Sequence, residues 1–392
     1  GQADAGETGL AGVAVELIDD ANSNGIVDPF ERAVDTQSTD ADGDYTLTGG
    51  QPLPDGTFAD VLLTGADFSD MAAGDVDGDG ILDIVGADSD GFTVLFGDGD
   101  GTFTTGPTVD EDRHPMQLGD LDGDGILDLV THNAGDGELT IRLGNGDGTF
   151  TVEQRLGGHP SGINGTNGIK LADLDGDGHQ DLLAMEINNQ RIVVRLGNGD
   201  GTFQARQNRS VGEKFGDEAL GDLNGDGTLD LAIRGLNQNL ITFIGDGDGT
   251  FSGKMTYALS DQYGGVAVGD VDADGVMDVA VGVDFDLAIL LGNGDGTLDS
   301  PIRFEATTQN ALQSLTVADF DADGFADVAG FDLNAEQVIV LWGNGDGTFP
   351  TKASFGAGGR PGGMLADDAN GDDVLDLIRS EERRVGKECA TG

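Results

Sequence analysis

The sequence predicts an all-β protein built from one repeated unit. An acidic segment of the form Asp-x-Asp-x-Asp-Gly-x-x-Asp begins at residue 75, and related segments begin at residues 120, 173, 222, 270, 319 and 368. The spacing between their first aspartates runs from 45 to 53 residues. Between these segments, short apolar runs alternate with Gly-rich turns, which indicates strands joined by hairpins and not helices. A period of this length is typical of a protein made of adjoining repeats.

Each acidic segment is predicted to form a calcium-binding loop. Oxygen atoms at positions 1, 3, 5 and 9 converge only if the backbone curls tightly, which a Gly at position 6, such as Gly80, permits. Carboxylates this close repel by roughly 4 kcal/mol per pair at a surface-like dielectric, so a hard divalent cation stabilises the loop. Calcium suits a flexible set of oxygens that includes a backbone carbonyl at position 7. No His or Cys side chain stands at ligand spacing, which argues against zinc.

The seven predicted sites use the same five positions, namely four side chains and one backbone carbonyl at position 7. In chain order the predicted ligands are Asp75, Asp77, Asp79, Ile81 and Asp83; Asp120, Asp122, Asp124, Ile126 and Asp128; Asp173, Asp175, Asp177, His179 and Asp181; Asp222, Asn224, Asp226, Thr228 and Asp230; Asp270, Asp272, Asp274, Val276 and Asp278; Asp319, Asp321, Asp323, Phe325 and Asp327; and Asp368, Asn370, Asp372, Val374 and Asp376. A single loop could be an accidental acidic turn, but seven in register argue against that reading.

These loops differ from EF-hands. An EF-hand places a bidentate Glu at position 12 and continues as a helix. Here the residues after each loop read as strands, and position 12 carries no Glu in any copy. The residues at that position are Gly86, Thr131, Ala184, Ile233, Val281, Gly330 and Arg379.

Residues 1–50 differ from the rest of the chain. The alternating run at residues 10–18 predicts a strand, and the segment after it places oxygen ligands at positions 1, 3, 5, 9 and 12 of a calcium loop. These ligands are Asp20, Asn22, Asn24, Asp28 and Glu31. The segment resembles the SdrD B-like (Cna B-related) domains of bacterial surface stalks, which implies a partial β-sandwich with one calcium ion. Asp4 and Glu7 fit either the end of a further loop or a solvated acidic turn.

Residues 51–56 are predicted to be a linker, and residues 57–378 hold the repeats. Each unit reads as a strand, the acidic loop, two further strands, a Gly-rich turn and a fourth strand, which is the pattern of a propeller blade. The turn is itself repeated, first as residues 97–103 and then at 144–150, 197–203, 245–251, 292–298 and 343–349. We interpret it as a hairpin turn whose Phe packs between blades. Its aspartates, such as Asp147 and Asp200, are alternative metal ligands.

Taken together, the acidic loops and the Gly-Asn-Gly-Asp-Gly-Thr-Phe turns resemble FG-GAP/VCBS repeats, the family that includes the propeller of integrin α-subunits. The resemblance covers residues 57–378. It implies a seven-bladed β-propeller with calcium in the loop between the first two strands of each blade. The departures are Asn224 and Asn370, which are neutral oxygen ligands, and Asp373, which stands where position 6 requires Gly. The seventh site is therefore expected to be the weakest.

Composition limits the possible partners. The 392-residue chain has a formal net charge of -54, so nucleic acid and anionic membrane surfaces are excluded as partners. This much charge also suggests disorder, but the acidic residues are concentrated in the loops, where calcium would neutralise them. No apolar stretch approaches the ~20 residues of a membrane span. Calcium sites of weak affinity work where calcium is abundant, which predicts an extracellular or cell-surface location. A signal peptide and any anchor are expected outside the sequence.

The end of the chain breaks the repeat. Residues 379–392 are basic, contain the single cysteine Cys389, and read like the translation of a common sequencing adapter, so we expect the native sequence to stop near Ile378. The alternative is a natural charged tail. If the native sequence does stop there, the seventh blade lacks its third strand, and the strand at residues 59–63 is predicted to supply its outer strand.

No catalytic constellation is visible, and we predict that the protein is not an enzyme. His114, His132, His159 and His179 stand without a nucleophile motif, and Trp342 is expected to pack between blades. The leading interpretation is a secreted or surface-anchored scaffold that uses a propeller for adhesion to an unidentified protein or glycan. The alternative is an accessory region of an extracellular polysaccharide-degrading enzyme whose catalytic domain lies elsewhere. A spacer without any ligand is a third possibility.

Overall fold

The chain divides into two compact units, Gly1–Asp60 and Val61–Gly392. This division falls just after the predicted linker. The computed structural model describes part of each unit. The described residues are 14–18, 33–38, 62–63, 68–88, 91–110, 113–133, 138–157, 168–259, 264–307, 311–356, 364–369 and 375–379.

In the first unit the structure describes one antiparallel strand pair, β1 (Ala14–Ile18) and β2 (Ala33–Ser38). Ala14 lies opposite Ser38, and a bulge interrupts the pairing between Leu17 and Ile18. The expected strand is thus confirmed over its second half. The predicted calcium loop at residues 20–31 lies outside the described residues, as do Asp4 and Glu7, so the partial β-sandwich stays a prediction.

The second unit contains six four-stranded antiparallel sheets, each built from consecutive strands. Blade one comprises β4 (Asp70–Gly74), β5 (Asp83–Ala87), β6 (Phe92–Gly97) and β7 (Phe103–Val109); blade two, β8 (Arg113–Gly119), β9 (Asp128–Asn133), β10 (Glu138–Gly144) and β11 (Phe150–Leu156); blade three, β12 (Ile169–Ala172), β13 (Asp181–Glu186), the 3-10 helix η1 (Ile187–Asn189), β14 (Arg191–Arg195) and β15 (Gln207–Ser210). Blade four comprises β16 (Phe215–Gly221), β17 (Asp230–Gly235), β18 (Asn239–Gly245) and β19 (Phe251–Ala258); blade five, β20 (Val266–Gly269), β21 (Asp278–Val283), β22 (Asp286–Leu290) and β23 (Ile302–Glu305); blade six, β24 (Gln313–Ala318), β25 (Asp327–Asp332), β26 (Gln337–Trp342) and β27 (Thr351–Gly356).

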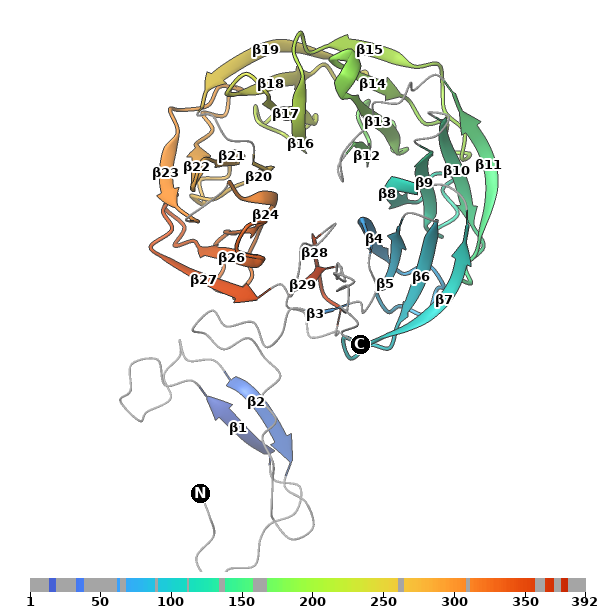
Figure 1. The fold of residues 1–392 in the computed structure, drawn as a ribbon, viewed down its shortest axis with the longest axis horizontal. Coiled ribbons are helices and arrows are strands. Elements are labelled where there is room, and N and C mark those ends of the chain that lie inside the picture. The colour runs from blue at the N-terminus through green and yellow to red at the C-terminus, as the bar shows by residue number, and fades with distance from the viewer. Residues whose placement is uncertain are drawn as a thin grey trace, which may run out of the picture. The chain divides into compact units, whose positions relative to one another are not determined.

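The six sheets stand around a ring, as Figure 1 shows. The first strand of each blade faces the centre of the ring, and the fourth strand lies at the rim. Neighbouring first strands contact one another, for example β4 with β8 and β20 with β24. The predicted β-propeller is therefore confirmed. In the described part of the chain, no helix is both long and apolar enough to cross a membrane.

The expectation of seven blades is wrong, because the structure has six. The seventh repeat forms a three-stranded sheet of β28 (Met364–Asp367), β29 (Asp376–Arg379) and β3 (Leu62–Leu63). The expected outer strand pairs directly with β29 and runs parallel to it, with Ile378 opposite Leu62. In a complete blade the second and fourth strands point the same way but are separated by the third. The sequence after Ile378 has neither an apolar third-strand run nor the Gly-rich turn motif, so this separation is lost.

Apolar side chains fill the spaces between adjacent blades. One such cluster joins Val130 and Ile141 of blade two to Leu182 and Val193 of blade three, and Phe203 of the turn motif is part of it. Equivalent clusters contain Phe251 between blades three and four, Leu298 between blades four and five, and Phe349 between blades five and six. The prediction that the turn Phe packs between blades is thus confirmed. Trp342 on β26 is also largely buried.

Removing one of these inter-blade rings should weaken the whole propeller. We expect Phe203→Ala to lower the unfolding free energy by about 3–5 kcal/mol, because it deletes a buried ring and leaves a cavity. Thermal unfolding followed by calorimetry measures this. Val152→Ala on β11 is the matched control, since Val152 is 41% exposed and its loss should change little. An equal effect of the two substitutions would contradict this assignment of the core.

Candidate metal centre

The acidic loops join the first and second strands of each blade. Their backbones turn through left-handed conformations, with a φ of 80° at Gly78 and 85° at Gly80 in blade one. In blades five and six, Ala273 and Ala322 adopt the left-handed conformation at position 4. At position 6 all six complete blades keep Gly, which reaches this conformation without steric cost.

Hydrogen bonds from the loop backbone hold the aspartates of positions 1, 3 and 5. In blade one, Asp75 accepts hydrogen bonds from the N–H of Gly78 (2.7 Å) and of Gly80 (2.9 Å). Asp77 accepts one from the N–H of Asp79 (3.2 Å), and Asp79 accepts one from the N–H of Ile81 (2.8 Å). Blades two and three repeat this pattern. The aspartates therefore shape the loop as well as lining it.

The aspartate at position 9 has a second role that the sequence did not reveal. Asp83 begins β5 and is 1% exposed. Its two oxygens accept hydrogen bonds from the N–H of Val76 in the loop (2.9 Å) and the N–H of Gly97 at the end of the third strand (2.9 Å). The same pair of bonds recurs at Asp128, Asp181, Asp230, Asp278 and Asp327. This aspartate thus connects three segments of its blade.

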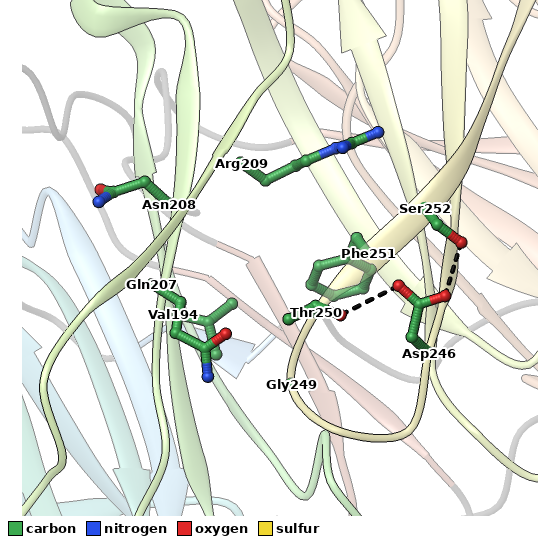
Figure 2. Close-up of a pocket in the computed structure, with 9 residues that line it drawn as sticks. All are labelled: Val194, Gln207, Asn208, Arg209, Asp246, Gly249, Thr250, Phe251 and Ser252. Carbon is green, nitrogen blue, oxygen red and sulfur yellow. Dashed lines mark hydrogen bonds between the residues drawn. The ribbon is translucent and has the colours of Figure 1, made fainter.

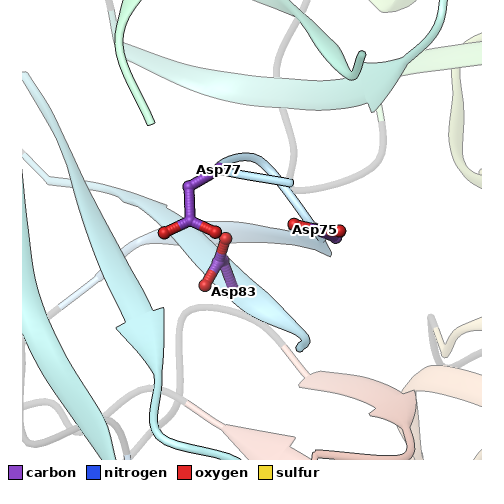
Figure 3. A group of neighbouring side chains, drawn as sticks. All are labelled: Asp75, Asp77 and Asp83. Carbon is purple, nitrogen blue, oxygen red and sulfur yellow. The ribbon is translucent and has the colours of Figure 1, made fainter. Parts of the chain in front are cut away.

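In five loops the structure brings three carboxylates together, with one oxygen atom of each lying within 4.8 Å of the others. They come from positions 1, 3 and 9, and Figure 3 shows them in blade one, where Asp75, Asp77 and Asp83 gather at the loop. The five groups are Asp75, Asp77 and Asp83; Asp120, Asp122 and Asp128; Asp173, Asp175 and Asp181; Asp270, Asp272 and Asp278; and Asp319, Asp321 and Asp327. Oxygens bound to one calcium ion at about 2.3–2.6 Å are separated by up to about 5 Å, so each group fits a single ion.

The other predicted ligands that the structure describes lie outside the three-carboxylate groups. The position-5 aspartates, such as Asp79, lie outside these three-residue groups. In blade four, Asn224 takes position 3 and donates a hydrogen bond to Asp226 (2.9 Å). In the seventh loop only Asp368 and Asp376 are described, and Asp376 accepts a hydrogen bond from Ala369 (3.1 Å), so the anchoring role recurs there. Asn370, Asp372 and Val374 lie outside the described residues.

Burial and mutual repulsion raise the pKa of the position-9 carboxyls. Removal from water raises the pKa of Asp128 and of Asp278 to about 6, and that of Asp327 to about 7. The backbone hydrogen bonds lower these pKa values, and the neighbouring loop carboxylates raise them further. The pKa values of Asp83, Asp181 and Asp230 are raised for the same reasons. A cation at the loop would reverse the unfavourable charge interaction.

The second motif acts as a turn. The Asn145 N–H donates to the Thr149 carbonyl (2.9 Å), and Asp147 accepts hydrogen bonds from the N–H (3.0 Å) and hydroxyl (2.5 Å) of Thr149. The turns at Asp100, Asp200, Asp248 and Asp295 repeat this arrangement. These hydrogen bonds from Thr hold the pKa of Asp147 and Asp200 below the usual value. Within the described residues, neither aspartate belongs to a three-carboxylate group.

The turn of one blade is hydrogen-bonded to the acidic loop of the blade before it. The Gly148 N–H of blade two donates to the Val76 carbonyl at position 2 of the first loop (3.0 Å), and the Gly201 N–H of blade three donates to the Leu121 carbonyl (3.0 Å). The series continues with Gly249, Gly296 and Gly347, which donate to Leu174, Leu223 and Val271. The loops of blades one to five are therefore fixed both within their own blade and by the next one.

The repeats match a known family. The FG-GAP-like repeat pattern matches residues 75–131, 120–184, 173–233 and 222–281, which together span more than half of the chain. The chain belongs to the FG-GAP-like repeat family. No functionally curated protein matches the sequence.

Solved structures share the fold at low sequence identity. A lectin from Agrocybe aegerita that recognises non-reducing terminal N-acetylglucosamine is 21% identical, with a TM-score of 0.56 over 79% of this chain and 84% of the lectin. BBS1N in complex with ARL6DN is 14% identical, with a TM-score of 0.56 over 80% of this chain and 89% of that one. An inactive virginiamycin B lyase from Staphylococcus aureus is 14% identical, with a TM-score of 0.51 over 78% of this chain and 90% of the lyase. These likenesses support the propeller fold of this FG-GAP-like repeat protein.

The structural role of the position-9 aspartate, which anchors backbone N–H groups, can be tested separately from its proposed role as a metal ligand. Without any metal, Asp181→Ala should still destabilise the protein by about 3 kcal/mol, because it leaves two backbone N–H groups without their charged acceptor. Asp177→Asn is the matched control, because Asp177 is an exposed predicted ligand, and its effect should appear only when calcium is present. Melting temperatures in chelator and in calcium measure both. If the two variants behave alike in chelator, Asp181 is not an anchor.

The raised pKa values predict how stability depends on pH without metal. A carboxyl whose folded pKa lies above its unfolded pKa contributes stability at low pH and loses it as pH rises through the folded value. For Asp128, Asp278 and Asp327 this window runs from about pH 4 to about pH 7. In chelator, the melting temperature should therefore fall as the pH rises from 5 to 7.5, and calcium should abolish this fall. A melting temperature that rises over this range in chelator would disprove the assignment.

Proposed function

We propose that the chain is a calcium-stabilised, non-catalytic binding scaffold, in which the propeller presents a surface for adhesion to a protein or glycan. The observation that carries the metal part is the set of three carboxylates gathered within 4.8 Å in five loops. The recurrence of the same geometry in five loops supports the same metal-binding role for each of them. The family supports a scaffold, because its repeats build the ring and leave the outer surface free for binding.

The choice of calcium rests on the donor set. Carboxylate oxygens from positions 1, 3 and 9 would hold the ion, and the position-7 carbonyl and position-5 aspartate are the remaining candidates in each loop. All of these are hard oxygen donors, which suit calcium better than zinc or copper. When bound, the ion neutralises the repelling carboxylates. At a calcium concentration about 100-fold above Kd, each site would add roughly 2.7 kcal/mol to the unfolding free energy.

The secreted or cell-surface location follows from the same argument. Seven loops and a net charge of -54 require abundant divalent ions if the charge is to be neutralised, and calcium is abundant outside cells. The non-catalytic part rests on the sequence, in which no nucleophile motif accompanies the histidines. The virginiamycin B lyase shares the fold, so the fold alone does not decide whether a propeller is catalytic. The proposal that this protein is not an enzyme is therefore based on its residues.

Metal removal tests the proposal directly. The melting temperature should fall by at least 10 °C in excess EDTA and return when calcium is added, while equal magnesium should restore less of it because magnesium demands a tighter octahedral site. Calorimetric titration should also show calcium binding at several sites. A melting temperature that is the same in EDTA and in calcium would disprove the calcium part of the proposal.

A further inference from the structure

A pocket of about 310 Å³ opens at the rim between blades three and four (Figure 2). One wall is formed by β15, the outer strand of blade three, and the other by the turn that leads into β19 of blade four. The volume is at the lower end of the range for small-ligand sites. It is lined by nine residues, whereas a folded protein partner contacts about 20–30 residues on each side, so the pocket is too small to be the main contact surface of such a partner.

The pocket arises where blade three departs from the repeat. The third strand of each blade has a residue five positions before the Gly that opens the turn motif. The residue of the outer strand that pairs with it can be compared from blade to blade. Five blades place an aliphatic or aromatic residue there, and blade three places an arginine. The residues are Val109, Leu156, Arg209, Tyr257, Phe304 and Phe355. At this register Val109, Leu156, Tyr257 and Phe304 pack into or against the inter-blade clusters, whereas Arg209 is exposed.

The Arg209 guanidinium is available to a ligand. It lies over the Phe243 ring, 5.3 Å from the centroid, and among the described residues it forms no ion pair. Figure 2 shows it extending from β15 toward the blade-four side of the pocket. Gln207 on the same strand also lines the pocket. This wall therefore carries side-chain hydrogen-bond donors, from Gln207 and Arg209, for which the described part of the chain supplies no acceptor.

The opposite wall supplies acceptors. Asp246 accepts hydrogen bonds from the hydroxyls of Thr250 (3.0 Å) and Ser252 (2.6 Å), which hold its carboxylate in one orientation. A carboxylate has about four acceptor positions, so it can accept further hydrogen bonds. Phe251 also borders the pocket, as Figure 2 shows, but it is 4% exposed and belongs to the inter-blade cluster, so it offers a ligand little surface.

We propose that this pocket binds a neutral pyranose residue of a glycan, an inference that rests on the glycan-binding form of the proposed function. A sugar hydroxyl donates and accepts at once, so neighbouring hydroxyls can accept from Arg209 and donate to Asp246. A purely anionic or cationic ligand would satisfy only one wall. Acidic sugars are further disfavoured by the net charge of -54.

A second rim pocket serves as an internal comparison. It has a volume of about 490 Å³ and lies between blades five and six, where Phe304 replaces Arg209 and Asn344 replaces Asp246 in the repeat. Lys352 bonds the carbonyl of Ala306 across that pocket (3.0 Å), as Lys254 bonds the carbonyl of Val211 beside the first (2.7 Å). The two sites are built alike, but among the described residues that line them, only the blade-three site has an arginine that makes no ion pair, because Arg303 in the second pocket is paired with Asp284 and Asp286. Specificity is therefore expected there.

The test uses the full chain in calcium. A glycan array should show binding of neutral oligosaccharides, and titration calorimetry with the best of them should show an affinity at least tenfold weaker for Arg209→Leu, which installs the residue that blade two has at this register. Arg155→Ala is the matched control, since Arg155 is an exposed arginine on the outer strand of blade two. The affinity of the Arg155→Ala variant for the same oligosaccharide should be unchanged. Melting temperatures of both variants should stay near the parent value, which separates lost binding from lost folding.

Three results would overturn the inference, and each says something different about the proposed function. Undiminished binding by Arg209→Leu would place the sugar elsewhere and leave a glycan-binding scaffold intact. Preference for acidic sugars would contradict the recognition chemistry alone. If no saccharide binds while calcium still stabilises the protein, the pocket assignment fails and adhesion to a protein remains.

Discussion

The whole propeller depends on one buried carboxylate per blade. In the six blades, the aspartate at position 9 has almost no exposed surface and accepts hydrogen bonds from the loop before it and from the end of the third strand. An apolar residue could fill the same volume but could not satisfy these N–H groups, and unsatisfied buried donors are costly. The negative charge that results is itself costly in a dry site. The same side chain thus holds the blade together and contributes negative charge to a group of carboxylates that could hold a cation.

The acidic composition is compatible with a folded protein because most loop carboxylates have local partners. Asp75, Asp77 and Asp79 each accept backbone N–H bonds within their own loop. The turn aspartates do the same with a threonine two residues later, as at Asp147. A prediction from average hydrophobicity and net charge would suggest disorder, because it ignores where the charged residues lie. In the structure these aspartates lie in hydrogen-bonded loops and turns.

The repeat made most of the fold predictable. Strand order, the acidic loops and the packing of Phe203 and its equivalents follow from a period that recurs along the chain, because each copy supports the reading of the others. The blade count could not be obtained this way, since it depends on what replaces a missing third strand, and the parallel pairing of Leu62 with Ile378 leaves no pattern in the sequence.

Site residues were predictable to different degrees for the same reason. Positions 1 and 3 follow from spacing alone. The anchoring role of Asp83 requires its partner Gly97, a residue far along the chain that only the folded sheet brings near. Arg209 could not be predicted from the sequence, because it departs from the repeat. Only the strand register shows which residues of the other blades are equivalent to it.

The bonds between turns and loops give the ring a direction. The turns of blades two to six each donate a hydrogen bond to the loop of the preceding blade, from Gly148 on Val76 to Gly347 on Val271. Displacing one of these turns would therefore disturb the acidic loop of the blade before it, so that a local change in one blade is passed on towards the N-terminal end of the ring.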